Sequence, residues 1–353
     1  MTSTAASVVA DDHRPDDEAL MARAIAAADH ARLLAPPNPW VGALVVTPDG
    51  VSFPGSTRRP GGEHAERVAL RLAGDRAAGA TLYTTLEPCA HRGRTGPCAT
   101  AIVGGGVARV VVAVLDPDPN VSGRGVAILE EAGIEVTVGP GAEAVERQLA
   151  PYLHHRRTGR PYVVLKLAAT LDGRTAAPDG TSQWITGEAA RADAHRLRAE
   201  SDAILVGAGT VRDDDPRLTV RGVIAPDGQP VREPLRVVLG TAPPEAAIHP
   251  CLEYSGPLPE VLDELGRRGV VQLMVEGGAT VAGRFHHEGL VDHYVVYLAP
   301  ALMGGEAGRP LFAGRGAATI GEMPRGRIEA ITPLGGDLRL DLTIDPAHRG
   351  HGG

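Results

Sequence analysis

The sequence has few aromatic residues and few cysteines, and each shortage excludes a class of protein. Phe, Trp and Tyr make up only 3% of the chain, so a base-stacking surface of the kind that binds single-stranded nucleic acid is not expected. The three cysteines are an odd number with two close together. This pattern fits metal ligation in a reducing compartment better than a disulfide framework. The leftover Cys251 is interpreted as an ordinary half-buried thiol.

Net positive charge and a long apolar run are also lacking. The formal net charge is -8, which argues against a nucleic-acid partner, because Lys and Arg carry most of the affinity for a phosphate backbone. Local basic clusters still allow a small anionic substrate. No run of about 18 apolar residues occurs, and the first residues lack the basic-then-apolar order of a signal peptide. We therefore expect a cytoplasmic protein with no membrane partner.

The length and the apolar content instead indicate two globular domains. The chain has 353 residues, 43% of them apolar, which suits two domains better than one core. Residues 1–15 and 346–353 are polar or Gly-rich without a period and are expected to be disordered. A charged segment with Gly and Pro, residues 154–162, follows a helix that should end near Pro151. The expected domains are therefore residues 16–157 and 158–345.

The periodicity of apolar residues predicts α/β structure in both domains. Residues 17–32 have the spacing of a helix with one buried face. Short β-branched runs predict strands at residues 41–47, 81–86, 108–115, 135–139, 163–168, 203–206, 235–239, 271–275 and 293–298. The stretches between them read as helices. Strands that alternate with helices indicate layered α/β sheets.

One His and two Cys in the first domain predict a catalytic zinc site. Zinc favours imidazole and thiolate ligands, and a catalytic site keeps three protein ligands so that the fourth position can hold water. His64, Cys89 and Cys98 supply that set. Two thiolates offset the charge of the ion, so its water is acidified less and a base is needed. Glu66, two residues from His64, is poorly placed to chelate and is expected to be that general acid/base.

A structural zinc is the alternative interpretation. It normally has four protein ligands, and the fourth would have to be His91. Because His91 stands two residues after Cys89, we expect it to face the pocket instead. Taken singly, His64 would more often be a core or capping residue and Cys89 a small buried hydrophobe.

The motifs, in their order, resemble the bifunctional deaminase–reductase family of riboflavin biosynthesis, the RibD/RibG type. They are NPWVG (38–42), HAE (64–66), LEPCAHRGRTGPC (86–98), KLAATLDGRTA (166–176), SQWIT (182–186), TVRDDDPRLTVR (210–221) and VEGG (275–278). The resemblance implies a cytidine-deaminase-like three-layer α/β domain followed by a dihydrofolate-reductase-like α/β domain. A homo-oligomer is also expected.

The resemblance implies a phosphorylated pyrimidine as substrate of the first domain. Asn38 is expected to contact the pyrimidine, although an Asn before Pro is otherwise most often a turn. Eight residues separate Cys89 from Cys98, more than the two that are usual in cytidine deaminases. This loop offers His91, Arg92 and Arg94 to a ligand larger than a base. Each arginine could equally be solvated.

The second domain lacks a G-x-G-x-x-G motif after a strand, so a Rossmann site is not indicated. A strand that runs into Glu276, Gly277 and Gly278 before a helix predicts an anion site at a helix N-terminus, although a plain turn is the simpler interpretation. The resemblance implies NADPH contacts at Ala168, Trp184, Thr210, Asp214, Gly278, Ala279, Thr280, Val281, Ala282, Gly283 and Arg284. It implies substrate contacts at Ser182, Arg198, Leu218, Arg221 and Glu276. Read without it, Trp184 would be a core residue and 213–215 the start of a helix.

The residue types fit these roles in part. Arg198 and Arg221 can pair a phosphate bidentately, and Trp184 offers a flat wall to a nicotinamide ring. Lys166, also assigned to the substrate, and Glu276 could polarise the sugar carbon that receives hydride.

One departure affects the second domain. After the strand at 235–239, the acidic residue expected of the family is Gly240, and the stretch 240–266 appears shortened. Thr241 could still offer a hydroxyl to the cofactor.

Three functional hypotheses result. The first is a zinc-dependent deamination of a diaminopyrimidinone ribosylamine phosphate, followed by NADPH-dependent reduction of its ribosyl group to ribityl. The second keeps the deaminase and treats the C-terminal domain as a weakened reductase or an assembly domain. The third is a nucleotide-binding regulatory protein with both sites idle, against which the intact His64, Glu66, Cys89 and Cys98 set argues.

Overall fold

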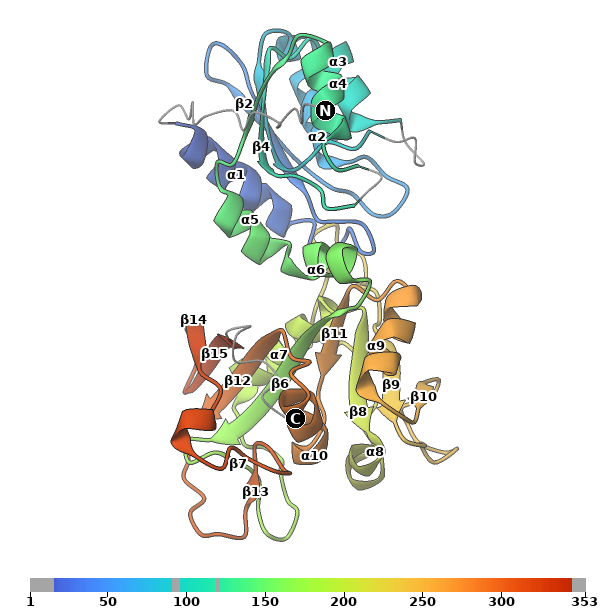
Figure 1. The fold of residues 1–353 in the computed structure, drawn as a ribbon, viewed down its shortest axis with the longest axis vertical. Helices are drawn as coiled ribbons and strands as arrows, with labels where there is room; N and C mark the ends of the chain where they lie inside the picture. The colour runs from blue at the N-terminus through green and yellow to red at the C-terminus, as the bar shows by residue number, and fades with distance from the viewer. Residues whose placement is uncertain (1–15, 91–95, 119–120, 345–353) are drawn as a thin grey trace, which may run out of the picture. The chain divides into compact units, whose positions relative to one another are not determined.

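The computed structural model describes residues 16–90, 96–118 and 121–344. It divides into two compact units, Met1–Leu153 and His154–Gly353 (Figure 1). The ends that were expected to be disordered, 1–15 and 346–353, lie outside the described residues. No helix in the described ranges combines the length and the apolar character that crossing a bilayer requires.

The first unit is a three-layer α/β fold around a five-stranded sheet. The strand order is β2–β1–β3–β4–β5; β1 is antiparallel to both its neighbours, and β3, β4 and β5 are parallel. The strands are β1 (Gly42–Val46), β2 (Ser52–Ser56), β3 (Thr81–Leu86), β4 (Arg109–Val114) and β5 (Glu135–Val138). The helices are α1 (Asp17–Asp29), α2 (Ala65–Ala73), the 3-10 helix η1 (Gly74–Ala77), α3 (Cys98–Gly104), α4 (Arg124–Glu131) and α5 (Ala142–Gln148). The predicted three-layer fold class is confirmed.

Two glycines on the neighbouring strands β1 and β2 let helices approach the sheet from opposite sides. A Cβ at Gly42 of β1 would lie 1.9 Å from the carbonyl oxygen of Ala24 in α1. A Cβ at Gly55 of β2 would lie 2.2 Å from the carbonyl oxygen of Ala65 in α2. Gly55 pairs with Ala43, the neighbour of Gly42, so the two glycines face opposite sides of the sheet. The backbone of α2, which carries Glu66 of the HAE motif, therefore lies directly on the sheet.

A buried ion pair joins the first helix to β4. The Arg109 guanidinium donates to both carboxylate oxygens of Asp17, at 2.9 and 2.7 Å, and both side chains are at most 4% exposed. Tyr83 Oη donates to the same carboxylate at 2.9 Å, and Arg109 Nε also pairs with Glu135 at 2.9 Å. The Asp17 carboxylate raises the pKa of Arg109, so the guanidinium stays charged inside the fold.

Removing one partner of this pair should destabilise the first unit strongly. Replacing Arg109 with methionine leaves the Asp17 carboxylate buried without its cation, which typically costs about 3–5 kcal/mol. The exposed pair Arg147–Glu143 is the control, because such pairs contribute only about 0–1 kcal/mol. Denaturant unfolding of Arg109→Met and Arg147→Met measures the difference. Equal losses for the two variants would contradict the role assigned to the buried pair.

The second unit is built on an eight-stranded mixed sheet with strand order β10–β9–β8–β11–β6–β12–β15–β14. The strands β10, β9, β8, β11, β6 and β12 are parallel to one another, while β15 and β14 are antiparallel to their neighbours. The strands are β6 (Tyr162–Thr170), β8 (Ala203–Gly207), β9 (Leu235–Leu239), β10 (Leu252–Tyr254), β11 (Gln272–Val275), β12 (His293–Ala299), β14 (Gly326–Leu334) and β15 (Asp337–Ile344), with β7 (Arg174–Ala176) and β13 (Arg309–Pro310) forming a separate pair. The helices are α7 (Glu188–Ala199), α8 (Ala208–Asp214), α9 (Leu258–Arg267), α10 (Ala279–His287) and the 3-10 helix η2 (Ile320–Glu322).

Both faces of this sheet are covered by helices. On one face Leu165 of β6 packs in a core cluster with Leu262 of α9 and Phe285 of α10. On the other face Val164 packs in a second cluster with Leu197 of α7. Adjacent residues of one strand point to opposite faces, so burial on both sides gives the continuous apolar runs that predicted these strands. The α/β class predicted for this domain is confirmed.

Some elements differ from the sequence-based expectations. Helix α6 (Ala150–Thr158) runs through the charged segment that was expected to follow a helix ending near Pro151. Charge does not break a helix, and the chain first meets Gly159 and Pro161, which do. Strand β2, with Pro54 and Gly55 inside it, and the largely exposed strand β14 gave no apolar signal.

Candidate active sites

The predicted zinc ligands meet in the first unit, although they come from three separate segments. His64 is the N-cap residue of α2, Cys89 follows β3, and Cys98 opens α3. His64 Nδ1 lies 3.7 Å from Cys89 Sγ and 3.4 Å from Cys98 Sγ. The main-chain N–H of Cys98 donates to Cys89 Sγ at 3.3 Å. The starts of α2 and α3 and the segment after β3 thus bring the three ligand atoms close together.

These distances fit a zinc ion. Zn–N of about 2.0 Å and Zn–S of about 2.3 Å at a tetrahedral angle separate a nitrogen from a sulfur by about 3.6 Å. The hydrogen bond between the two thiols lowers the pKa of Cys89, with His64 adding to the shift, and raises the pKa of Cys98. Cys98 has no exposed surface. The cluster therefore has the ligand types, the spacing and the shielding that zinc requires.

Glu66 lies beside this cluster and is almost fully buried. It stands in the first turn of α2 and is 3% exposed. Burial raises the pKa of Glu66 to about 6, and the charge of Cys89 adds to the shift. A carboxyl group with a pKa near neutrality can both take up and return a proton at physiological pH. That is the property expected of a general acid/base at this position.

Glu87 is a site residue that sequence reasoning missed. Its buried carboxylate accepts hydrogen bonds from the main-chain N–H groups of Asp116, Gly123 and Gly125 at 2.9–3.2 Å. These bonds tie the chain just before Cys89 to the segment that leads into α4. At Gly125 a Cβ would lie 2.0 Å from the carbonyl oxygen of Pro88. Glu87 is therefore a positioning residue, and the signal was a carboxylate placed directly after an apolar strand.

The expected pyrimidine contacts are only partly described. Asn38 is half-buried in the turn before β1, and its main-chain N–H donates to the carbonyl oxygen of Ala35 at 2.9 Å. His91, together with Arg92 and Arg94, lies outside the described residues. Trp40 is 2% exposed, and its Nε1 donates to the carbonyl oxygen of Gln148 at 3.1 Å.

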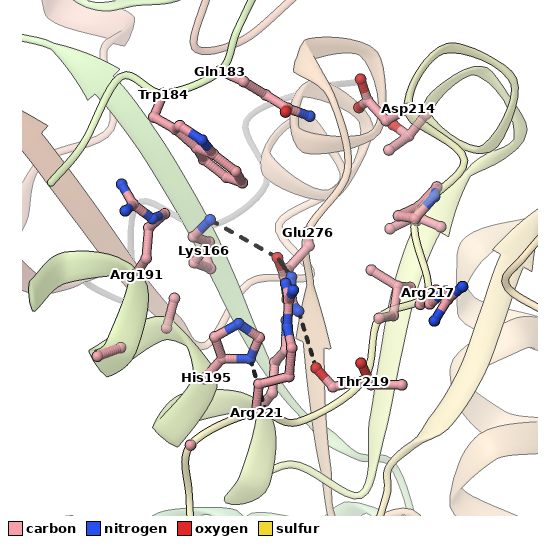
Figure 2. A pocket seen from close by; sticks show the side chains of 18 of the residues that line it. Lys166, Gln183, Trp184, Arg191, His195, Asp214, Arg217, Thr219, Arg221 and Glu276 are labelled. Carbon is pink, nitrogen blue, oxygen red and sulfur yellow. Dashed lines mark hydrogen bonds and ion pairs between the residues drawn. The ribbon is translucent and has the colours of Figure 1, made fainter. Parts of the chain in front are cut away.

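The second unit contains two adjoining cavities, of about 750 and 680 Å³. Figure 2 shows one of them, with Lys166 and Glu276 at its floor and Trp184 at its rim. Lys166, Trp184, Thr210, Asp214 and Glu276 line both cavities. The first cavity is also lined by Arg198, Leu218 and Arg221, and the second by Ala168, Ser182, Gly278 and Ala279. The first group consists of predicted substrate contacts and the second of predicted cofactor contacts, except that Ser182, a predicted substrate contact, lines the second cavity.

An ion-pair network forms the floor that the two cavities share. Arg198 donates to both carboxylate oxygens of Glu276, at 2.6 and 2.9 Å, and Lys166 Nζ lies 3.8 Å from the same carboxylate. Although burial opposes it, these cations hold the pKa of Glu276 below its usual value. The remaining Nη1 of Arg198 donates to the carbonyl oxygen of Thr219. The Arg198 guanidinium, which was expected to pair a substrate phosphate, thus binds Glu276 instead in this structure. Arg221, the other arginine expected to pair the phosphate, is exposed and lines the first cavity.

Lys166 is the single lysine of the chain; the other 34 of its 35 Lys and Arg residues are arginine. Arginine keeps its proton at all relevant pH values, whereas an ammonium group can give up a proton. The only lysine therefore lies on the floor of the cavities, where its ammonium group could donate a proton to a bound ligand.

Trp184 and His195 extend the picture of the first cavity. Trp184 is 67% exposed, which excludes the core role it would have without the resemblance, and the Arg191 guanidinium lies 4.7 Å from its ring. His195, which sequence reasoning missed, accepts a hydrogen bond at Nδ1 from the main-chain N–H of Arg221 at 3.3 Å. Burial and the nearby arginines lower the pKa of His195. An uncharged imidazole therefore faces the cavity beside Glu276 (Figure 2).

The predicted anion site at a helix start is present, but most of the residues assigned to it face elsewhere. Helix α10 begins at Ala279 with Gly278 as N-cap, directly after the strand that ends at Val275. Val281, Ala282 and Gly283 are buried in the core of the unit, and Arg284 is near the C-terminal end of α10, where it pairs with Glu288. In a helix, residues of the second turn no longer offer free N–H groups to a ligand. The structure therefore brings only the first residues of this run to the cavity.

The stretch 240–266, which was expected to be shortened, does not form the cavities. Gly240 has φ of +102° and donates its N–H to Tyr254. An acidic residue would be strained at this φ. The stretch still forms β10 and α9, and none of the described residues that line either cavity belongs to it. Thr241, a predicted cofactor contact, is exposed in the loop after β9 and is likewise absent from both linings.

Comparisons with known proteins agree with this division. The chain matches the family of the cytidine and deoxycytidylate deaminase zinc-binding region over residues 14–114, and the family of the RibD C-terminal domain over residues 161–340. It is 39% identical to the riboflavin biosynthesis protein RibD of Escherichia coli, over 92% of this chain and 99% of that protein. It is 44% identical to RibD of Mycobacterium tuberculosis, over 87% and 91%.

Solved structures show the same similarity. RibD of Acinetobacter baumannii superposes with a TM-score of 0.88 at 38% identity, covering 94% of this chain and 99% of that one. A diaminohydroxyphosphoribosylaminopyrimidine deaminase/5-amino-6-(5-phosphoribosylamino)uracil reductase of Thermotoga maritima gives 0.82 at 31% identity, covering 93% and 99%. With a zinc-binding deaminase region ahead of a RibD C-terminal domain, this chain belongs to the RibD family of bifunctional deaminase–reductases of riboflavin biosynthesis.

Proposed function

We propose that this chain acts on 2,5-diamino-6-(ribosylamino)-4(3H)-pyrimidinone 5'-phosphate. The first unit removes the 2-amino group by hydrolysis, and the second unit uses NADPH to reduce the ribosyl group of the product, 5-amino-6-(5-phosphoribosylamino)uracil, to ribityl. The observation that carries this proposal is that one chain brings together the His64, Cys89 and Cys98 cluster with buried Glu66 and, in its other unit, the Lys166–Glu276 floor.

The first unit supplies a base next to its metal ligands. His64, Cys89 and Cys98 would hold a zinc ion, which would supply Lewis-acid activation of water. The Glu66 carboxylate takes a proton from the attacking water and returns it to the departing amino group, which leaves as ammonia. Burial keeps its proton affinity high enough for the second transfer.

The second unit orients the sugar and supplies a proton. NADPH, when bound, supplies the hydride. The ring oxygen of the ribosyl group must take up a proton as its C1 carbon is reduced, and the Lys166 ammonium group is placed to donate it. Glu276 holds Lys166 in position and is held itself by Arg198. Arg221 and Arg217 on the cavity wall can pair the phosphate.

The identity of the product tests the proposal. Incubating the chain with the diaminopyrimidinone phosphate and NADPH should give a product that has lost the 2-amino group and gained two hydrogens on the sugar, which mass spectrometry resolves. A product that is deaminated but not reduced would support the alternative of a deaminase with a weakened reductase. Unchanged substrate would contradict both and support a regulatory protein.

Loss of zinc should separate the two activities. Cys89→Ser removes one of three ligands, and we expect ammonia release to disappear with the metal, because the nucleophile is no longer activated. Reduction of the already deaminated substrate should continue at its normal rate, because its cavities lie in the other unit. Both rates are measured on the same preparation. Deamination that survives without zinc would remove the metal from the mechanism.

A further inference from the structure

A second group of metal-ligand side chains lies in the reductase unit. Among the described residues, two groups of at least three His, Cys, Asp or Glu side chains bring their ligand atoms within 4.8 Å of one another. One is the deaminase cluster, and the other is His249, Cys251 and Glu253. The three occupy alternate positions, and β10 begins at Leu252 between them. Cys251 and Glu253 flank Leu252 and point to the same side of the extended chain, and His249 lies in the loop before β10.

Hydrogen bonds to His249 and Glu253 prepare these two side chains for a cation. His249 Nε2 donates to the carbonyl oxygen of Pro243 at 2.9 Å, which leaves Nδ1 as the unprotonated nitrogen. That nitrogen faces Cys251 Sγ at 3.5 Å. A histidine that ligates a metal usually donates its other ring N–H to a carbonyl or carboxylate in this way, which fixes its tautomer.

The carboxylate and the main chain are fixed as well. Glu253 Oε1 accepts the N–H of Ala242 at 3.0 Å and thereby orients the carboxylate. Arg236 Nη1 donates to the carbonyl oxygens of Ile248 and His249, each at 3.3 Å. The segment before β10 is therefore held in the conformation that groups the three side chains.

We propose that His249, Cys251 and Glu253 form a second zinc site that fastens the 240–251 connection to β10. The nitrogen–sulfur distance of 3.5 Å matches the roughly 3.6 Å expected for two ligands of one tetrahedral zinc. A thiolate and a carboxylate together balance the charge of a divalent ion. His249 and Glu253 are exposed and Cys251 is half-buried, so the fourth position is open to solvent and the ion is exchangeable.

The site is independent of the proposed reactions. None of the three residues is among those that line the two cavities of the unit. The ion would instead hold together residues 242–253 at the edge of the sheet, where β10 supplies only three residues of pairing with β9. The proposed ion would therefore stabilise the short pairing of β10 with β9 at this edge of the sheet.

Zinc content tests the proposal directly. The full-length chain, equilibrated with zinc and desalted, is analysed for metal by atomic emission. We expect two zinc ions per chain for the wild type and for Glu245→Gln, which removes an exposed acidic residue of the same connection, and one for Cys251→Ser. Both activities should remain in Cys251→Ser. A wild type that holds one zinc, or a Cys251→Ser variant that holds as much as the wild type, overturns the proposal.

Cobalt gives a second, spectroscopic test. The chain has three cysteines, so in a His64→Ala/Cys89→Ala/Cys98→Ala variant any thiolate-to-cobalt absorption comes from Cys251. We expect this near-ultraviolet band on addition of Co²⁺ and its loss when His249→Ala is added. A folded triple variant without the band overturns the proposal, and if the triple variant does not fold, the zinc count of Cys251→Ser decides.

Discussion

Glu66→Gln should lower the rate of ammonia release by about 10²–10⁴-fold, the range typical for loss of a general acid/base. Glutamine keeps the size of the buried side chain but can neither accept the proton of the attacking water nor return it. The zinc content should stay at the wild-type level, because Glu66 is not among the ligands in the cluster. Ammonia release and metal content are measured on the same protein.

A neighbouring glutamate provides the control for this variant. Glu63 lies one residue before His64 and pairs with Arg71 at 3.0 Å on the surface. Glu63→Gln should therefore deaminate at nearly the wild-type rate. Should Glu66→Gln release ammonia normally while it retains zinc, the proton transfer assigned to Glu66 is wrong.

Lys166→Arg should abolish most NADPH oxidation although it keeps the positive charge. We expect a loss of about 10²-fold or more, because a guanidinium group does not release a proton in a protein. Ammonia release should be unchanged, since Lys166 lies in the other unit. NADPH absorbance with the deaminated substrate measures the effect.

The control for Lys166→Arg is the reverse substitution, arginine to lysine, at an exposed residue. Arg268→Lys keeps a cation beside Glu264 and should not alter either rate. Lys166→Gln, which removes the charge as well, should be at least as slow as Lys166→Arg. Normal NADPH oxidation by Lys166→Arg would show that charge alone suffices and that the sugar takes its proton from another donor.

The deaminase centre was predictable because its chemistry depends on residue types at fixed spacing. Cysteine is rare in this chain, with three residues, and zinc accepts few ligand types other than cysteine and histidine. Glu87 escaped notice because its role depends on main-chain N–H groups more than 25 residues away, which a one-dimensional pattern does not contain.

The reductase centre was less predictable because its parts have no fixed spacing. Arg198 was assigned to the substrate phosphate from the resemblance and from the bidentate geometry of its guanidinium group, whereas its contact with Glu276, 78 residues away, becomes visible only in the fold. The run from Gly278 was read as one site, whereas helix periodicity turns Val281 and Ala282 into the core. Strand β14 gave no signal, because pairing with β15 rather than burial of its side chains defines it.

The central claim, that one chain performs both steps, is tested most directly by following ammonia and NADPH together in one reaction. With the diaminopyrimidinone phosphate as substrate, we predict that one NADPH is oxidised for each ammonia released. When Glu66→Gln replaces the wild type, we predict neither ammonia release nor NADPH oxidation, because the reductase then receives no product. Ammonia release without NADPH oxidation would contradict the claim.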